Sequence, residues 1–129
     1  MNEWEVVYHP EFEAWYDSLS SKDKARVLAR VDYLAANGPA ARRPLVGKIA
    51  ASRHSNMKEL VAPGDIRVLF AFDPDSKAVL LVGGTKTDRW KAWYEANIPL
   101  ADERFDQWLK TRADKNKKRR TPEDGPRSG

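Results

Sequence analysis

Apolar positions near the start of the chain recur at a helical period. Between residues 12 and 35 they follow one another at spacings of three and four, which is typical of helices that bury one face. Pro10 suits the first turn of the first helix, and Gly38-Pro39 ends the second. Ser20 and Asp23, between the two, resemble a capping box. This stretch therefore predicts two helices that form a hairpin.

Short apolar runs rich in β-branched and aromatic residues predict four strands. They are Glu3–Tyr8, Met57–Val61, Ile66–Phe72 and Ala78–Val82. Turn signals separate the last three, and short turns make neighbouring strands antiparallel. Side chains alternate along a strand, so Arg67 lies on one face of the sheet while Val68 and Phe70 lie on the other. Residues 40–56 show neither the helical nor the strand period of apolar residues, so we predict that they form a loop.

The last third of the chain predicts helix followed by a tail without structure. Residues 88–97 have helical spacing, and a further helix is expected to begin near Pro99, with Phe105 and Trp108 in its apolar stripe. From Asp114 onward no apolar residue is larger than alanine or proline, so burial cannot offset the ordering entropy and disorder is expected. We therefore predict a domain at residues 1–112 and a basic, disordered tail at residues 113–129.

The predicted order of elements is strand, helical hairpin, basic loop, three-stranded meander and helix. This order indicates an α+β fold: a small antiparallel or mixed sheet with the N-terminal helical hairpin on one face, and a C-terminal helix. The predicted order of elements can be met with helices on only one face of the sheet. We therefore expect the other face, which carries Arg67, to be open.

Composition and charge narrow the range of functions. The chain has 129 residues and no cysteine, and no apolar run approaches the ~20 residues that a membrane helix needs. We therefore expect a cytoplasmic protein without disulfides, a thiolate zinc site or a membrane partner. Residues 42–91 hold 10 basic and 5 acidic residues, and residues 110–129 hold 8 basic and 3 acidic ones. Segregated positive charge of this kind suits an anionic partner such as RNA.

The end of the last predicted strand combines glycine, cations and large aromatic residues. The segment contains Gly83, Gly84, Lys86, Arg89, Trp90, Lys91, Trp93 and Tyr94. The helical spacing of its aromatic residues favours core packing for two of them and leaves the third free to stack on an RNA base. The two glycines are expected to let RNA or backbone approach closely.

Three motifs occur together between residues 57 and 94. They are a Met-Lys-Glu-Leu strand, a turn followed by Arg-Val-Leu-Phe-Ala-Phe-Asp-Pro, and Gly-Gly-x-Lys-Thr before a segment rich in Trp and Tyr. Together with the N-terminal strand and hairpin, these motifs resemble the RelE/ParE superfamily of type II toxins and, within it, the HigB-like branch. The resemblance covers residues 3–110 and leaves the tail outside.

The resemblance implies a RelE-like fold and the activity of a ribosome-dependent endoribonuclease, an mRNA interferase that needs neither metal nor cofactor. It also implies a cognate antitoxin, which in this branch is usually a helix-turn-helix DNA-binding protein, and the ribosome and mRNA as further partners. Two alternatives stay open. One is a ParE-like gyrase inhibitor without nuclease chemistry, and the other is a non-catalytic module that binds RNA or the ribosome.

Metal-independent RNA cleavage uses the 2′-OH as the nucleophile against the neighbouring phosphate. It requires a base, cations for the charge that develops on the phosphorane, and an acid for the leaving oxygen. The resemblance implies Arg67 for the scissile phosphate, Lys86 as the basic residue at the end of the last strand, and Tyr94 as a catalytic or stacking aromatic. Lysines crowded by other cations can act as acid or base because their pKa values fall.

The positions of other polar residues suggest further candidates. Lys58 and Glu59 alternate between faces, so at most one of them shares the face of Arg67, and we favour Lys58 as catalytic. His54 in the basic loop is a candidate base, whereas His9 precedes a helix and is expected to be structural. The expected RNA-binding residues are Lys48, Arg53, Arg89, Trp90 and Lys91.

Overall fold

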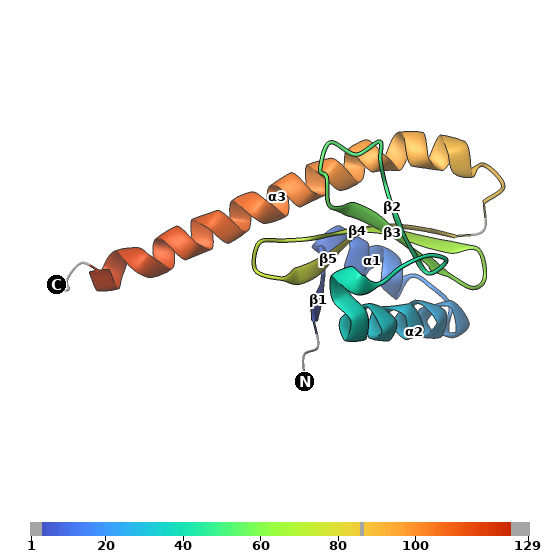
Figure 1. Cartoon of the computed structure of the whole chain (residues 1–129), viewed down its shortest axis with the longest axis horizontal. Helices are drawn as coiled ribbons and strands as arrows, with labels where there is room; N and C mark the ends of the chain where they lie inside the picture. The colour runs from blue at the N-terminus through green and yellow to red at the C-terminus, as the bar shows by residue number, and fades with distance from the viewer. Residues whose placement is uncertain (1–3, 86, 125–129) are drawn as a thin grey trace.

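A mixed five-stranded sheet lies at the centre of the residues that the computed structural model describes, which are 4–85 and 87–124, with 116–124 as backbone only (Figure 1). Its strands are β1 (Glu5–Tyr8), β2 (Val46–Lys48), β3 (Met57–Ala62), β4 (Ile66–Phe72) and β5 (Lys77–Thr85), in the spatial order β1-β5-β4-β3-β2. β1 runs parallel to β5, and the other neighbours are antiparallel. The four predicted strands are confirmed. β2 lies in the stretch that we predicted to be a loop, because three residues are too few to show a period.

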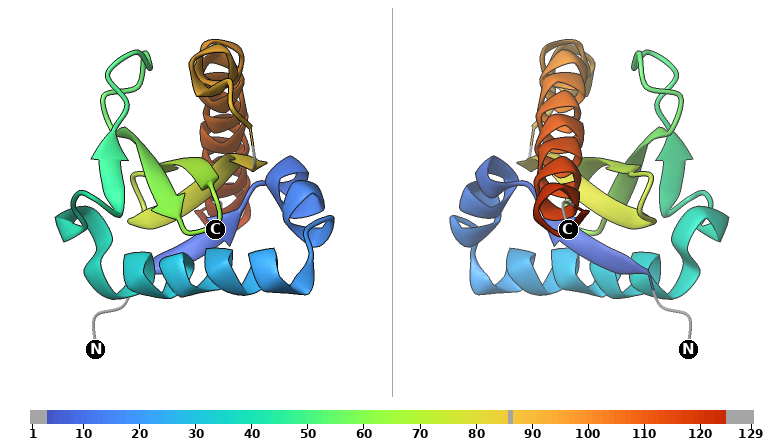
Figure 2. Two further views of the ribbon diagram at one scale, coloured as in Figure 1. Left: turned by 90° about the vertical axis from the view of Figure 1, so that its right-hand side faces the viewer. Right: turned by 90° about the vertical axis from the view of Figure 1, so that its left-hand side faces the viewer.

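The helical hairpin covers one face of the sheet, as predicted (Figure 2). His9 caps the N-terminus of α1 (Pro10–Asp17), because its Nδ1 accepts a backbone N–H of the first turn. Ser20 caps α2 (Ser21–Asn37) in the same way through its hydroxyl, and Gly38 caps the end of α2, where the 3₁₀ turn η1 (Gly38–Ala40) follows. The core on this face includes Phe12, Leu34, Val68, Phe70 and Leu80.

The opposite face is covered by α3 (Trp90–Asp124), so our expectation of an open face is wrong (Figure 2). We also predicted a break near Pro99, but α3 is a single helix. Proline removes one helical hydrogen bond, and packing against the sheet on both sides of it holds the helix together. The core on this face includes Leu69, Ala71, Val79, Leu81, Ile98, Ala101 and Phe105.

The C-terminal part of α3 extends beyond the sheet (Figure 1). We predicted disorder from Asp114 onward, but the backbone is helical to Asp124, and residues 125–129 lie outside the described chain. Alanine, lysine and arginine have high helix propensity, and a helix that is already packed propagates without a new nucleus. The division into a domain at residues 1–112 and a tail at 113–129 stays a prediction. Within the described chain, no helix combines the length and apolar character needed to cross a membrane.

Two glycines at the end of β5 make room for tryptophan rings, and not for RNA or backbone as we had expected. A Cβ built on Gly83 would lie 2.3 Å from the Trp15 ring, and one on Gly84 would lie 2.4 Å from the Trp93 ring. Successive strand residues face opposite sides, so Trp15 of α1 and Trp93 of α3 approach β5 from its two faces. The pair therefore determines how closely both helical layers pack on this strand.

We predict that Gly84→Ala lowers the free energy of unfolding by about 1–3 kcal/mol, because the Trp93 ring and the start of α3 must move. Gly47→Ala is the matched control in a strand. There the nearest atoms, 2.9 Å from the built Cβ, belong to the end of the flexible Arg43 side chain, which can move aside. Urea unfolding of both variants measures the difference. Equal costs at the two positions would contradict the role given to Trp93.

Candidate active site

Three polar side chains meet on the face of the sheet that α3 covers. Glu59 on β3 pairs across the ladder with Leu69, and Val61 pairs with Arg67, so Glu59 and Arg67 share that face. Tyr94 reaches them from the second turn of α3. Its Oη donates a hydrogen bond to the Glu59 carboxylate and accepts one from Arg67 Nη1 at 2.6 Å. Arg67 Nη1 also lies 3.9 Å from Glu59 Oε1. We call Glu59, Arg67 and Tyr94 the polar cluster.

The polar cluster is only partly open to solvent. The side chain of Glu59 is 10% exposed and that of Arg67 is 30% exposed. Burial raises the pKa of Tyr94, and the hydrogen bond to Glu59 raises it further, whereas Arg67 acts in the opposite direction. Tyr94 therefore keeps its proton at neutral pH and remains a hydrogen-bond donor to the carboxylate.

The guanidinium of Arg67 is held in place by an aromatic ring as well. Its Cζ lies 4.8 Å from the centroid of the Trp90 ring, within the range of a cation–π contact. Trp90 Nε1 donates to Asp65 Oδ1 at 2.9 Å, which fixes the indole against the β3–β4 turn. Trp93 and Tyr94 pack against the core, so the expectation that two of the three aromatic residues do so is confirmed. The remaining N–H groups of Arg67 are available to an anionic ligand.

Lys58 does not share the face of Arg67, so our preference for it over Glu59 is wrong. Lys58 pairs with Phe70, which belongs to the core beneath the helical hairpin. Lys48 pairs with Lys58 and therefore lies on the same side. The antiparallel register decides this question, and it depends on how many residues the β3–β4 turn contains. The sheet separates both lysines from the polar cluster.

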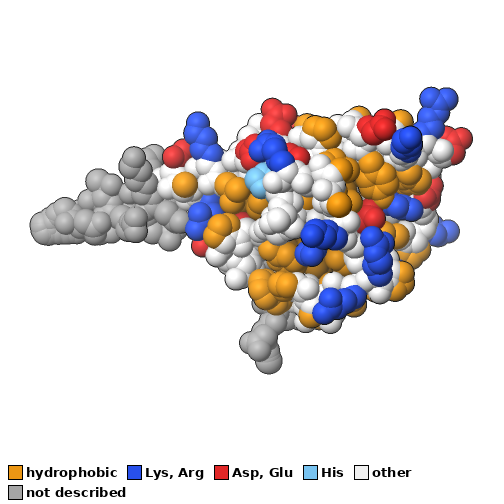
Figure 3. Space-filling view, turned by 45° about the horizontal axis from the view of Figure 1, so that its top comes forward, with side chains coloured by type: hydrophobic (Ala, Val, Ile, Leu, Met, Phe, Trp, Pro, Cys, Tyr) orange, Lys and Arg blue, Asp and Glu red, His pale blue; other side chains and the backbone are white. Residues whose placement is uncertain are grey.

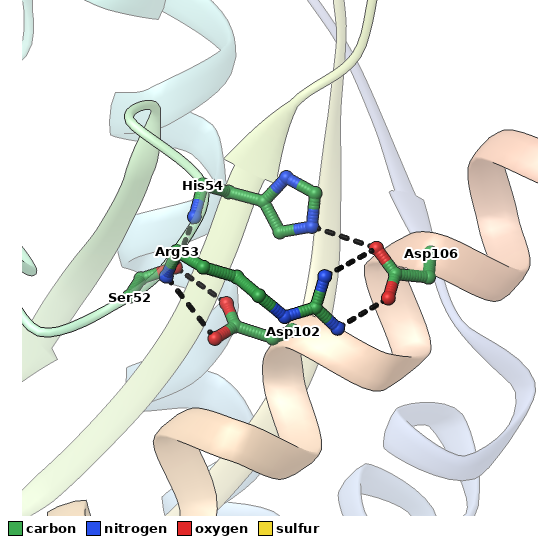
Figure 4. A network of polar contacts seen from close by, with 5 residues as sticks. All are labelled: Ser52, Arg53, His54, Asp102 and Asp106. Carbon is green, nitrogen blue, oxygen red and sulfur yellow. Dashed lines mark hydrogen bonds and ion pairs between the residues drawn. The ribbon is translucent and has the colours of Figure 1, made fainter.

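His54 and Arg53 fasten the loop after β2 to α3 (Figure 4). Arg53 makes two contacts with the carboxylate of Asp106, and His54 Nε2 lies 2.8 Å from it. The hydrogen bond from Arg53 lowers the pKa of Asp106, and the one from His54 adds to this effect. Asp106 follows Tyr94 by twelve residues, which is about 18 Å along a helix. His54, the candidate base, and Arg53, a candidate RNA-binding residue, thus lie well away from the polar cluster.

Two of the three remaining predicted cations, Arg89 and Lys91, lie at the start of α3. Lys86 lies outside the described residues. Arg89 and Lys91 are exposed on either side of Trp90, so both are close to the Arg67 end of the cluster. Among the residues that the structure describes, no three His, Asp or Glu side chains come together as a metal site would require.

Two residues on the face of the polar cluster, Glu59 and Arg43, were not predicted from the sequence. Glu59 was set aside in favour of Lys58, although a carboxylate in the middle of an apolar strand is itself a signal. The guanidinium of Arg43 lies over Gly47, which pairs with Glu59, so Arg43 is a further cation on the face of the polar cluster. It stands in an irregular loop, where no periodicity predicts its position. Figure 3 shows Lys and Arg side chains interspersed with hydrophobic ones on the surface away from the C-terminal extension.

Comparison with known sequences gives the family of the chain. The family model described as phage derived protein Gp49-like (DUF891) matches residues 14–106. HigB3 of Mycobacterium tuberculosis, named as a toxin, is 46% identical over 105 residues, which cover 81% of this chain and 92% of HigB3. HigB2 of the same organism, also named as a toxin, is 41% identical over 117 residues, which cover 87% of this chain but only 58% of HigB2.

Solved structures share the fold. A chain of the RelBE2 toxin–antitoxin complex from Mycobacterium tuberculosis matches with a TM-score of 0.53 and 14% identity, over 68% of this chain and 97% of that chain. A chain of the archaeal RelE–RelB complex from Pyrococcus horikoshii OT3 matches with a TM-score of 0.52 and 22% identity, over 68% of this chain and 99% of that chain. The predicted RelE-like α+β fold is therefore confirmed. The chain belongs to the Gp49-like family, together with the HigB toxins.

Proposed function

We propose that this toxin is an endoribonuclease that cuts mRNA on the ribosome by attack of the RNA's own 2′-OH. The observation that carries the proposal is the guanidinium of Arg67, held between Tyr94 and the Trp90 ring with part of its surface free. A preorganised cation stabilises the charge that develops on a phosphorane without reorganising during the reaction. The same side chain also provides the planar donor group that matches phosphate oxygens.

The proton of the attacking 2′-OH also needs an acceptor. The Tyr94 hydroxyl already donates to the Glu59 carboxylate. It can therefore take up the 2′ proton while it passes its own proton to Glu59, which makes the pair a relay between substrate and carboxylate. The leaving 5′ oxygen also needs a proton donor. Lys86, which the family resemblance implies as the basic residue at the end of the last strand, lies outside the described residues.

We infer that the partners are the translating ribosome with its mRNA and a cognate antitoxin. Support for the antitoxin comes from the RelBE2 and RelE–RelB structures, which are toxin–antitoxin complexes with the same fold. The helix-turn-helix character of the antitoxin is implied by the family resemblance and, like the cytoplasmic location, stays a prediction. Support for an RNA partner comes from the cations that face the same side as the polar cluster, among them Arg43 and Arg67.

The activity is tested with purified protein, translating ribosomes and a defined mRNA. We expect products with a 2′,3′-cyclic phosphate and a 5′-OH. Arg67→Ala should slow cleavage by about 10²–10³-fold, as the loss of one charge-stabilising donor typically does. Arg67→Lys should rescue only in part, because an ammonium group lacks the planar fork and the stacking on Trp90.

Lys22→Ala, an exposed position at the start of α2, serves as the control that removes a charge on the hairpin side. Circular dichroism of each variant establishes that it is folded. Full activity of a folded Arg67→Ala protein would remove Arg67 from the mechanism. A wild-type protein that arrests growth without cutting mRNA would instead favour gyrase or another protein target.

The C-terminal extension of α3 generates a separate prediction. Truncation after Ala113 keeps the contacts of Trp108 with Asp73 and of Arg112 with Asp75, so the fold and the cut sites should be unchanged. It removes five cations of the run 115–120, so affinity for ribosomes should fall at low salt and differ much less at high salt.

Binding of the full-length and truncated proteins across a salt series measures this effect. A full-length variant with these five cations changed to glutamine separates charge from length. Unchanged binding at low salt would make the extension inert. Altered cut sites would mean that the extension belongs to the active site.

A further inference from the structure

A pocket of about 310 Å³ opens beside the polar cluster, and nothing in the proposed chemistry uses it. It lies between α3 and the loop after β2. Its walls include Ala51 from the loop and Tyr94, Ile98 and Pro99 from α3. These walls are mostly apolar, and the volume of the pocket is at the lower end of the roughly 300–1,000 Å³ typical of ligand sites. It is therefore suited to one flat group and not to a helix or a strand.

The loop wall of the pocket is fixed before any ligand binds. Asp102, which also lines the pocket, is buried, and its carboxylate accepts hydrogen bonds from the Ser52 hydroxyl and from the backbone N–H of Arg53. The contacts of Arg53 and His54 with Asp106 hold the same loop one turn further along α3. Asp102 is thus occupied as an acceptor, and it connects α3 to the loop that carries Ala51.

The rim of the pocket carries two charged groups that are free to bind. Lys91 and Glu95 stand four residues apart on α3, so they lie on the same side of the helix. Both are exposed, and neither side chain makes a hydrogen bond or an ion pair with another residue of the described chain. The rim therefore offers one ammonium donor and one carboxylate acceptor, side by side, above apolar walls.

Tyr94 belongs both to this pocket and to the polar cluster. Its ring lines the pocket, while its hydroxyl contacts Glu59 and Arg67. A group bound in the pocket therefore lies next to whatever Arg67 binds. Since the proposed function gives Arg67 a phosphate of RNA, the adjacent group is a base of the same strand.

We propose that the pocket binds a nucleobase of the RNA next to the phosphate held by Arg67, and that guanine is the base it fits best. An aromatic base is flat and apolar on its faces, which suits walls made of Ala51, Ile98 and the Tyr94 ring. Guanine presents N1–H and N2–H side by side, matching the two oxygens of a carboxylate such as Glu95. Its O6 and N7 accept from a lysine, here Lys91. Adenine, cytosine and uracil lack two adjacent donors.

This inference rests on the proposed function, so its test includes a readout that needs no cleavage. Protein with ¹³C-labelled alanine and isoleucine methyl groups is titrated with each of the four nucleoside 3′-monophosphates. We expect 3′-GMP to shift the Ala51 and Ile98 methyl signals with a dissociation constant about tenfold lower than those of the other three, a ratio within the range for one bidentate base contact. Ile66, in a different part of the core, is the internal control and should not move.

Variants then separate the pocket from the rest of the surface. Ala51→Leu fills the pocket and should abolish the Ile98 shift, whereas Ala96→Leu, on an exposed position of α3 that does not line the pocket, should leave it intact. Glu95→Gln keeps the shape of the side chain but removes one acceptor, so the preference for 3′-GMP should disappear. Cut-site mapping should show the same loss of guanine beside the cleaved bond.

The outcomes distinguish the two proposals. If 3′-GMP shifts Ile98 but the protein cuts no RNA, the pocket is a nucleotide site and the proposed nuclease function is wrong. If the protein cuts RNA but no nucleotide shifts Ile98 or Ala51, the nuclease function stands and the base pocket is refuted. Equal binding of all four nucleotides, or an unchanged preference in Glu95→Gln, would refute the assignment of guanine.

Discussion

The buried carboxylate of Glu59, on the sheet face that α3 covers, determines how α3 fits onto the sheet. Glu59 is almost fully buried on β3, and a buried charge is costly unless it is paired and hydrogen-bonded. Its partners come from two other elements, Arg67 from the neighbouring strand and Tyr94 from α3. Satisfying Glu59 therefore fixes the position of α3 over the sheet, and at the same time holds the guanidinium of Arg67 in the geometry that the proposed chemistry requires.

α3 extends this constraint along the whole molecule. Beyond Tyr94, Asp102 and Asp106 hold the loop after β2, and Trp108 donates to Asp73 in the β4–β5 turn at 2.8 Å. These contacts lie on one rigid helix, so the loop that forms the pocket wall and the tyrosine that reaches the polar cluster are positioned together. One helix, α3, thus brings together segments of the site that are far apart in the sequence. The sequence had predicted two helices in its place.

Short-range features of the fold were predictable because their causes are short-range. The roles of Ser20 and Gly38 depend on residues within one helical turn, and the strand boundaries of the meander follow from local turns and alternation. Within the site, family resemblance pointed to Arg67 and Tyr94, and the structure brings them into contact.

Features that depend on distant partners were not predictable in this way. The choice between Lys58 and Glu59 depends on strand register, which one extra turn residue would reverse. Gly83 and Gly84 were expected to admit RNA or backbone, because the tryptophans that occupy their space come from helices far away in the sequence. Arg43 could not be found at all, since its place over the sheet depends on the path of an irregular loop.

The most direct test of this account is the coupling energy between Glu59 and Tyr94, measured by urea unfolding of Glu59→Leu, which has no acceptor, Tyr94→Phe and the double variant. Each single change removes the same hydrogen bond between hydroxyl and carboxylate, so the double variant has no further bond of this kind to lose. We predict that the two single costs together exceed the cost of the double change by at least about 1 kcal/mol, as found for residues in one buried network. Costs that add to within about 0.5 kcal/mol, as they do for independent sites, would show that Tyr94 does not anchor α3 through Glu59.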